Sequence, residues 1–544
     1  MQIENPVLKG FNPDPSIVRV DDTYYIATST FEWFPGVQIH ESKDLVNWRL
    51  ITHPLSTRTL LDMKGNKDSA GIWAPDLSYA DGKFWLVYTD VKVTEGAFKD
   101  MTNYLTTAES IEGPWSDPIK LNGVGFDASL FHDDNGKKYL VQMEWDHREY
   151  RHPFNGIKLT EYSVEQQRLL PETAKIIYKG TDVKLVEGPH IYKLFGYYYL
   201  FCAEGGTVYT HQEVVARSAE LFGSYETQPG DVFLTAFDSP DGELQKCGHG
   251  SLVDTPSGEW YFAHLTGRPW HRETESIRDP RGWCTLGRET AIQKVEWNEE
   301  KWPYIVGGKQ GSRFVEAPKG CTVTKYAPTY PETDHFDSAA LNINFSTLRV
   351  PFDERMGSLT EKPGNLRLFG KGSLTNEHEQ SLVARRWQSF YFDAQTAVAY
   401  SPYTFQQMAG LANYYNTGHW SMIHVTWNEI NGRVIEVTQN DRGVLTSFLK
   451  DKAVKVPEHV EYVHFKAKVR KETYTYAYSF DGEQWTDIDV TLDAAILSDD
   501  YVVQSYGGFF TGAFVGMANV DYSGYELPAD FDYFTYKEFE NNES

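Results

Sequence analysis

Five stretches of the chain begin alike, and this repetition constrains the fold more than any other feature of the sequence. Each has an ionisable residue, then Ser or Pro with apolar residues, a turn signal, and a β run rich in Tyr, Trp and Phe. The five segments begin Asp14-Pro-Ser-Ile, Asp76-Leu-Ser-Tyr, Asp127-Ala-Ser-Leu, Glu187-Gly-Pro-His and His249-Gly-Ser-Leu. Their leading residues are 62, 51, 60 and 62 positions apart, which is enough for a four-stranded unit with its turns. The repetition predicts a five-bladed β-propeller.

The rest of the sequence indicates a second domain. A chain of 544 residues is too long for one hydrophobic core. Residues 1–305 carry the five units, and residues 306–331 are rich in Gly and Pro without periodic pattern, as is typical of a linker. Strand-like alternation resumes in residues 332–544 without the repeated motif. We therefore expect an all-β chain in which a β-sandwich of the jelly-roll or lectin type follows the propeller.

Charge and composition exclude several classes of function. A net charge of −25 argues against nucleic acid, an anionic membrane or a strongly acidic substrate as partner. The four cysteines show no C-x-x-C spacing, so we expect free thiols and no metal site built on them. The N-terminus has no basic segment followed by an apolar run, and no stretch approaches 18 apolar residues. These features predict a soluble, cytoplasmic protein.

A propeller gathers equivalent residues of its blades at one end of its axis. On a ring of radius about 4–5 Å, carboxylates of neighbouring units lie about 5–6 Å apart and others about 8–9 Å, and the longer separation admits a water molecule, as inverting glycosidases require. Asp14 and Glu187 belong to the first and fourth units, which are not neighbours. Asp127 belongs to the third unit, so its charge is expected to raise the proton affinity of Glu187.

Four segments carry a resemblance to a known family. They are Asn12-Pro13-Asp14-Pro15-Ser16-Ile17, Trp73-Ala74-Pro75-Asp76, Phe126-Asp127-Ala128-Ser129-Leu130 and Glu187-Gly188-Pro189-His190. They resemble the signature elements of glycoside hydrolase family 43. The likeness extends over the whole chain, including Gly507-Gly508-Phe509-Phe510-Thr511-Gly512, and indicates the two-domain β-D-xylosidases of that family.

The resemblance implies an activity and the roles of three carboxyl groups. It implies an exo-acting, inverting hydrolase that releases D-xylose from the non-reducing ends of β-1,4-xylooligosaccharides, with α-L-arabinofuranosidase side activity. Asp14 would be the general base, Glu187 the general acid, and Asp127 the residue that tunes the acid and orients the substrate. The family also leads us to expect a homo-oligomer.

Seven further residues are candidates for substrate binding. Arg288 matches a family arginine that hydrogen-bonds sugar hydroxyls, although a surface ion pair would also explain it. His249 occupies the fifth ring position, where a structural histidine is the alternative. The remaining candidates are Trp73, Phe31 and Trp145 as pocket walls, and Thr207 as a donor to a hydroxyl. We also expect one of Phe509 and Phe510, with Phe510 preferred, to reach over from the sandwich as a rim. Core packing is the alternative for the aromatic residues. The family assigns no transferable role to Asp76, which we also place in the ring.

No cofactor is expected for the chemistry. The sequences Asp334-His-Phe-Asp337 and Asp530-Phe-Asp532 lie near the two ends of the second domain, where lectin-like sandwiches bind calcium. Oxygen ligands suit that ion, so a structural calcium is possible there.

Three other functions stay open at this point. The first is an enzyme of the same fold that cleaves arabinan or acts mainly as an arabinofuranosidase. The second is a non-catalytic sugar-binding protein. The third is a retaining glycosidase of the sucrose-cleaving type, but the Asn-Asp-Pro-Asn motif of that type is missing.

Overall fold

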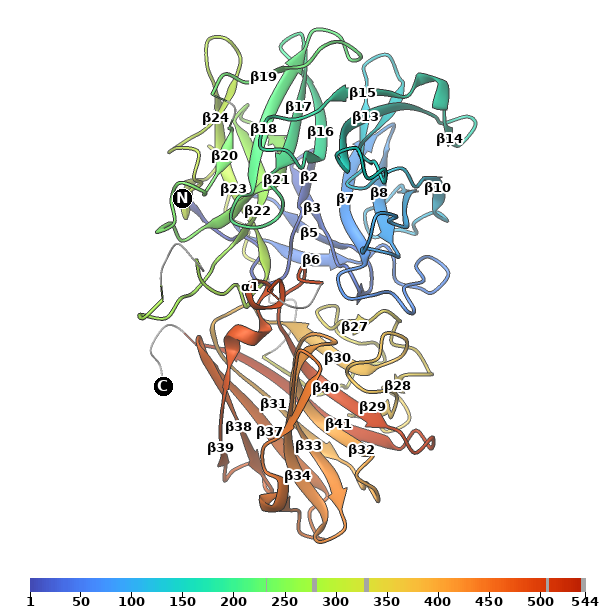
Figure 1. Ribbon diagram of the computed structural model, residues 1–544, viewed down its shortest axis with the longest axis vertical. Coiled ribbons are helices and arrows are strands. Elements are labelled where there is room, and N and C mark those ends of the chain that lie inside the picture. Colours follow the sequence, from blue (N-terminus) through green and yellow to red (C-terminus); the bar gives the residue numbers. More distant parts are fainter. Residues whose placement is uncertain (231, 276–280, 327–331, 505–507, 540–544) are drawn as a thin grey trace.

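The chain forms two β-domains stacked end to end (Figure 1). The computed structural model describes residues 1–230, 232–275, 281–326, 332–504 and 508–539. Within these ranges the one α-helix is α1 (Asp499–Val502), and none of the helices has the length and apolar character needed to span a membrane. The short 3₁₀ helices are η1 (Pro171–Thr173), η2 (Lys450–Lys452) and η3 (Ala494–Leu497).

The predicted five-bladed propeller is confirmed. Five separate antiparallel sheets follow one another along the chain. The first two blades are β2 (Ser16–Val20), β3 (Thr23–Thr28), β5 (Gln38–Ser42) and β6 (Arg49–Thr52), then β7 (Gly71–Ala80), β8 (Lys83–Val91), β9 (Met101–Ala108) and β10 (Ile119–Asn122). The third is β11 (Ser129–His132), β12 (Lys138–Trp145), β13 (Phe154–Ser163), β14 (Arg168–Leu169) and β15 (Lys175–Tyr178). The last two are β16 (Glu187–Leu194), β17 (Tyr197–Glu204), β18 (Gln212–Ser218), β19 (Glu226–Thr227) and β20 (Leu234–Thr235), then β21 (Gln245–Asp254), β22 (Trp260–Gly267), β23 (Arg288–Trp297) and β24 (Pro303–Ile305).

The ring of blades closes between the first and the fifth. Strand β2 packs against both β7 and β21, so the first blade has the second and the fifth as neighbours. The N-terminal strand β1 (Gln2–Glu4) pairs with β25 (Phe314–Glu316), and Leu8 bridges to Thr290 of the fifth blade. Residues 314–316 therefore complete the propeller, although the prediction placed them in the linker. A strand of three residues between glycines and prolines is too short to show alternation in the sequence.

The second domain is a sandwich of two antiparallel sheets, as predicted. One sheet contains β28 (Gly357–Ser358), β29 (Leu366–Phe369), β41 (Pro528–Glu538), β31 (Tyr391–Ala399), β37 (Tyr462–Arg470), β38 (Thr473–Ser479), β39 (Thr486–Asp493) and β26 (Thr333–Asp334). The other contains β30 (Ser381–Arg386), β40 (Phe514–Asp521), β32 (Gln407–Asn416), β33 (His419–Asn428), β34 (Gly432–Asp441), β35 (Val444–Ser447) and β36 (Val454–Lys455). One large apolar core lies between the two sheets.

The two domains share a buried aromatic interface. Strand β4 (Trp33–Phe34) of the propeller pairs with β27 (Thr347–Leu348), which lies between β26 and β28 of the sandwich in the chain. The ring of Trp33 stacks on that of Phe514 with their centroids 3.6 Å apart. Nearby, the fully buried Arg349 donates from Nη2 to Asp68 at 2.8 Å. The sandwich is therefore packed onto the propeller as one unit, because both apolar contacts and a buried ion pair cross the boundary.

Candidate active site

A pocket of about 360 Å³ lies at the mouth of the propeller channel, where it faces the sandwich. All ten predicted site residues line it, together with eight others. The predicted ten are Asp14, Phe31, Trp73, Asp127, Trp145, Glu187, Thr207, His249, Arg288 and Phe510. The structure thus brings the predicted residues together, while their chemical roles stay predictions.

An unusual backbone conformation turns three of the ring residues toward the axis. Asp14, Asp127 and His249 have φ angles of 55°, 52° and 46°, in the left-handed region that non-glycine residues rarely adopt. Each such residue costs about 1–3 kcal/mol, which the surrounding structure must offset. The same strained conformation at the start of three blades explains why the sequence repeats a short motif there.

Asp14 is held by three neighbours. Its Oδ2 accepts a hydrogen bond from the Ser29 hydroxyl at 2.6 Å, and its Oδ1 accepts one from Nη1 of Arg288 at 3.2 Å. The same Oδ1 lies 3.7 Å from Nδ1 of His249. The side chain is 5% exposed, so these contacts replace most of its hydration and fix its direction.

Asp127, which is buried, and Glu187, which is half-buried, form a pair of acids. Burial raises the pKa of Glu187 to about 8; the charge of Asp14 adds to the rise and Arg288 opposes it. Burial, then the charges of Glu187 and Asp14, raise the pKa of Asp127 well above its usual range, although its Oδ2 accepts from the Gly188 N–H at 3.2 Å. Since each acid disfavours ionisation of the other, the pair retains a proton at neutral pH.

His249 lies between two of the carboxyl groups. Its Nδ1 is 3.7 Å from Oδ1 of Asp14 and 4.0 Å from Oδ2 of Asp127. Burial lowers its pKa to about 4 in spite of these acids. Gly188 packs against the imidazole so closely that a Cβ at that position would lie 2.8 Å from the ring. The histidine is therefore a neutral, rigid floor to the pocket.

Arg288 connects the bottom of the pocket with its rim. Its Nη1 donates to Thr207 Oγ1 at 2.9 Å as well as to Asp14, and its Nη2 donates to the carbonyl oxygen of Phe510 at 2.9 Å. Its guanidinium carbon is 5.3 Å from the ring centroids of both Phe31 and Phe510. The surface ion pair considered for Arg288 is wrong, because the residue is only 3% exposed.

Aromatic rings form the walls. Phe510 lies 5.6 Å from both Phe31 and Trp73 between ring centroids, so a side chain of the sandwich completes a wall of the propeller pocket. Its N–H also donates to Ser69 Oγ at 2.9 Å. The Trp145 ring lies 5.7 Å from that of Phe154 between centroids, and its indole N–H donates to the carbonyl of Ala97 at 2.9 Å. Gly507, part of the motif that suggested this rim, lies outside the described residues.

Eight further residues line the pocket. They are Lys99, Phe126, Phe154, Leu185, Gly205, Gly206, Val208 and Phe509. The prediction named Phe509 as the alternative to Phe510, and the other seven were missed. Lys99 precedes β9, and its Nζ lies 4.7 Å from the Trp145 ring centroid. Burial lowers its pKa. Phe126 stands inside a quoted motif and could have been found there, whereas no pattern in the sequence marks Lys99.

Asp76 does not reach the pocket. Its Oδ2 accepts from the backbone N–H of Leu130 in the next blade at 2.9 Å. In the same way, the Ser16 hydroxyl accepts a hydrogen bond from the Leu77 N–H at 3.0 Å, and the Ser251 hydroxyl accepts one from the Ile17 N–H at 2.8 Å. Asp76 is therefore equivalent to Ser16, which stands two residues after the ring position of Asp14. The prediction that placed Asp76 in the ring was wrong.

Two other acidic groups bear on metal binding. In the sandwich, the two oxygens of Asp530 accept from Arg367 at 2.7 and 3.0 Å, so this carboxylate does not fit a calcium site and we derive no role for that ion. Cys284, Asp499 and Asp500 lie close together, but Nζ of Lys246 is 2.7 and 2.9 Å from the two carboxylates. All four cysteines are free thiols, as predicted.

A propeller channel that ends in acids of raised pKa, walled by aromatic rings, has the groups that a glycoside hydrolase needs. Residues 3–303 match the model of glycosyl hydrolases family 43, and residues 333–537 match the β-xylosidase C-terminal Concanavalin A-like domain. The chain belongs to glycoside hydrolase family 43.

Individual proteins agree with this assignment over their full length. The chain is 57% identical to a β-xylosidase of Bacillus subtilis, covering 99% of this chain and 100% of that protein. It is 45% identical to a xylosidase/arabinosidase of Humicola insolens, covering 98% of each. The crystal structure of a xylan β-1,4-xylosidase from Bacillus halodurans superimposes with a TM-score of 0.94 at 52% identity, covering 98% of this chain and 100% of that one.

Proposed function

We propose that this hydrolase is an exo-acting, inverting β-xylosidase that removes single D-xylose units from the non-reducing ends of β-1,4-xylooligosaccharides. The observation that carries the proposal is the pocket at the channel mouth, to which the first blade contributes Asp14 and the fourth blade contributes Glu187. Acids on blades that are not neighbours leave room for a water molecule beside the sugar. The names of the relatives from Bacillus subtilis and Bacillus halodurans support the substrate.

The mechanism follows from the proton affinities. Glu187, whose pKa is raised to about 8, enters the reaction protonated at neutral pH and gives its proton to the glycosidic oxygen. Asp14, held by Ser29 and Arg288, takes a proton from water as it attacks the anomeric carbon from the opposite face. Each cycle thus leaves Glu187 ionised and Asp14 protonated, and proton exchange with water restores both.

Asp127 serves the acid. Its carboxyl accepts from the N–H of Gly188, the residue that follows Glu187, so it fixes the direction of the acid as well as its proton affinity.

Trp73, Phe31 and Trp145 present flat faces to the C–H groups of the sugar, and Thr207 and Arg288 supply polar contacts to its hydroxyls. Phe510 blocks the side nearest the sandwich, which favours attack on chain ends.

Side activity on α-L-arabinofuranosides is part of the proposal, because the two pentoses present similar hydroxyl patterns in one pocket. The name of the Humicola insolens relative includes both activities. Initial rates on an aryl β-xyloside, an aryl α-arabinofuranoside and xylobiose test the assignment. A higher kcat/KM on the arabinofuranoside would make the enzyme an arabinofuranosidase, and no xylose from xylobiose would refute the function. Homo-oligomerisation and a cytoplasmic location stay predictions.

A further inference from the structure

The seven-stranded sheet of the sandwich has a second buried layer of side chains on its outer face. In β33 and β34, Ile423, Val425, Ile435 and Val437 point into the core between the sheets. Successive residues of a strand point to opposite faces, so Met422, His424 and Thr438 point outward. These three are 2%, 2% and 7% exposed. Side chains on the free face of a sheet are usually solvated, so this burial requires an explanation.

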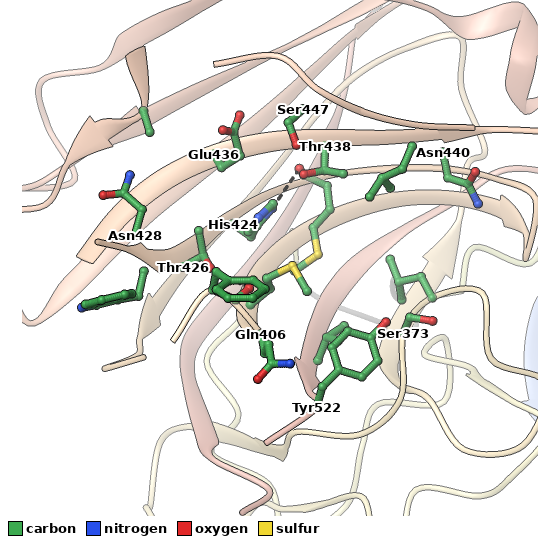
Figure 2. Close-up of a pocket in the computed structure, with 18 of the residues that line it drawn as sticks. Ser373, Gln406, His424, Thr426, Asn428, Glu436, Thr438, Asn440, Ser447 and Tyr522 are labelled. Atoms are coloured by element: carbon green, nitrogen blue, oxygen red, sulfur yellow. Dashed lines mark hydrogen bonds between the residues drawn. The ribbon is translucent and has the colours of Figure 1, made fainter. Parts of the chain in front are cut away.

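A cavity of about 690 Å³ lies over this outer face (Figure 2). It is nearly twice as large as the pocket at the propeller channel, which measures about 360 Å³. Strands β33, β34 and β35 form its floor. Segments outside these strands contribute Ser373, Gln406 and Tyr522 to its lining (Figure 2). None of the residues of the active-site pocket lines this cavity.

Four polar groups of the lining make no hydrogen bond with the described part of the protein. Nε1 of Trp420 and Oδ1 of Asn440 are buried. The other two, on His424 and Thr438, open to the cavity. Nδ1 of His424 donates to the carbonyl of Met422 at 3.3 Å, which leaves Nε2 as an acceptor without a partner. Burial lowers the pKa of His424 to about 4, so the imidazole is neutral. The hydroxyl of Thr438 is likewise unpaired among the described residues. Thr438 is the cross-strand neighbour of Ser447, so a row of hydrogen-bonding groups crosses three strands (Figure 2).

The cavity does not offer a charged ligand a partner on its floor. The carboxylate of Glu436 accepts from the backbone N–H groups of Val437, Leu449 and Lys450 at 2.8–2.9 Å, so the protein already uses it. The Lys450 side chain is at the exposed edge. An anion would face the Glu436 carboxylate. A cation would have to share carboxylate oxygens that already accept three N–H hydrogen bonds, so the lining favours a neutral ligand.

Much of the rest of the lining is apolar and includes exposed aromatic rings. Trp420, Trp427, Met408 and Met422 contribute to it, and Phe405 and Tyr522 stand at the rim with 61% and 55% of their surfaces exposed. A purely apolar ligand would leave His424 and Thr438 without partners, at a cost in affinity. A sugar satisfies both requirements, because its C–H faces pack on aromatic rings while its hydroxyls donate to an imidazole nitrogen and exchange hydrogen bonds with Thr and Ser.

We propose that this cavity is a second saccharide-binding site, separate from the active site, which takes a neutral xylooligosaccharide segment. The identity of the sugar rests on the proposed function, and the existence of the site rests on the cavity. Because β33 and β34 lie in the lower domain of Figure 1, a chain held there occupies the sandwich while the propeller pocket is free for a chain end. The site would raise the local concentration of chain ends without taking part in the chemistry.

Calorimetry with xylohexaose tests the proposal in the full chain. The host is Asp14→Asn, so that the sugar is not consumed, and two binding sites per chain are expected. Adding Phe405→Ala and Tyr522→Ala should abolish one site. Adding Tyr525→Ala, an aromatic residue of the same domain that is 77% exposed and does not line the cavity, should leave both. Thr438→Val, which keeps the shape and removes the hydroxyl, should weaken only the second site, by about fivefold.

Two outcomes would overturn the proposal. One is a single xylohexaose site that the cavity substitutions do not affect. The other is a change of molecular mass in sedimentation on Phe405→Ala and Tyr522→Ala with unchanged sugar binding, which would make the face an interface between copies of the chain. In an otherwise unmodified chain, Phe405→Ala and Tyr522→Ala should preserve kcat/KM on xylobiose. Failure of the unmodified chain to cleave xylobiose would instead contradict the proposed function, so the two failures are distinguishable.

Discussion

Arg288 of the propeller donates from Nη2 to the backbone carbonyl of Phe510 in the sandwich at 2.9 Å. Its other terminal nitrogen donates to Asp14 at 3.2 Å. One guanidinium group therefore connects the proposed base with the residue that closes the pocket, across the boundary between two domains. The fork of the guanidinium suits this task, because it fixes two partners at a set angle.

Replacing Phe510 should show how much the sandwich contributes to catalysis. Phe510→Ala removes ring contacts with Phe31 and Trp73, and we expect kcat/KM on xylobiose to fall by about tenfold or more. Phe509→Ala should cost less, because Phe509 packs partly against the sandwich core. Melting temperatures of both variants serve as the control for folding. Equal losses in the two variants would contradict the assignment of the rim to Phe510.

The repetition in the sequence was enough to predict the blades and the residues at the channel mouth. It sufficed because one backbone geometry, with positive φ at Asp14, Asp127 and His249, recurs at the start of three blades. Repetition misplaced Asp76 because an acidic residue can stand either in the ring or two positions later. At the later position its oxygen accepts a hydrogen bond from the next blade, as the Ser16 hydroxyl does. The sequence pattern is the same in both cases.

Contacts between separate segments were the part that could not be predicted. Lys99 reaches the pocket through the course of a loop, and the pairing of β4 with β27 joins segments more than 300 residues apart. The cavity over β33 and β34 was missed for a related reason. The alternation in those strands predicts which residues share a face, but loops that are distant in the sequence decide whether that face is covered.

The two catalytic acids should differ in their response to the leaving group. Glu187→Ala deprives the departing oxygen of its proton, so xylobiose hydrolysis should fall by about 10²–10⁴-fold, while an aryl xyloside with an acidic phenol should retain far more of its rate. Asp14→Ala should impair both substrates alike, because each needs the activated water. Rates over a series of aryl xylosides provide the measurement. The same leaving-group dependence in the two variants would show that the roles are misassigned.

The alkaline limit of activity should report the ionisation of Glu187. The acid works only while protonated, so kcat/KM should fall as the pH rises through the pKa of about 8. Asp127 is itself an acid of raised pKa, so Asp127→Asn removes a charge beside Glu187 only at pH values where Asp127 is ionised. There it should ease the ionisation of Glu187 and move the alkaline limb to lower pH. Burial is the larger cause of the raised pKa, so the limb should stay above the usual range of a glutamate. A limb at unchanged pH would restrict Asp127 to positioning.

Hydrolysis should invert the configuration of the sugar. Asp14 and Glu187 stand on blades separated by the fifth blade in one direction and by two blades in the other, so a water molecule fits between the base and the anomeric carbon. A β-xyloside should therefore release α-xylose first, which proton NMR of the anomeric signals detects before mutarotation. Initial release of β-xylose, or a covalently labelled Asp14, would rule out this mechanism.

The propeller should not be a competent enzyme without the sandwich. A fair test ends the chain after residue 326, because a shorter fragment would lose β25 and with it the closure of the ring. In this fragment Trp33 loses the ring of Phe514, and Asp68 loses Arg349 and the Thr417 N–H and hydroxyl that it accepts from.

The exposed face of that fragment carries both apolar and acidic groups. Burial raises the pKa of Glu32 to about 8 in the full chain, and Asp68 raises it further while Arg349 opposes the rise. Without the sandwich these carboxyls become hydrated and ionised beside bare aromatic rings, so we expect aggregation or a markedly lower melting temperature. Arg288 would also lose the carbonyl of Phe510, and the pocket would lose its rim. The rate of xylobiose hydrolysis by any soluble fragment should therefore be at least tenfold below that of the full chain. A soluble, monomeric fragment with full activity would refute the view that the sandwich completes the active site.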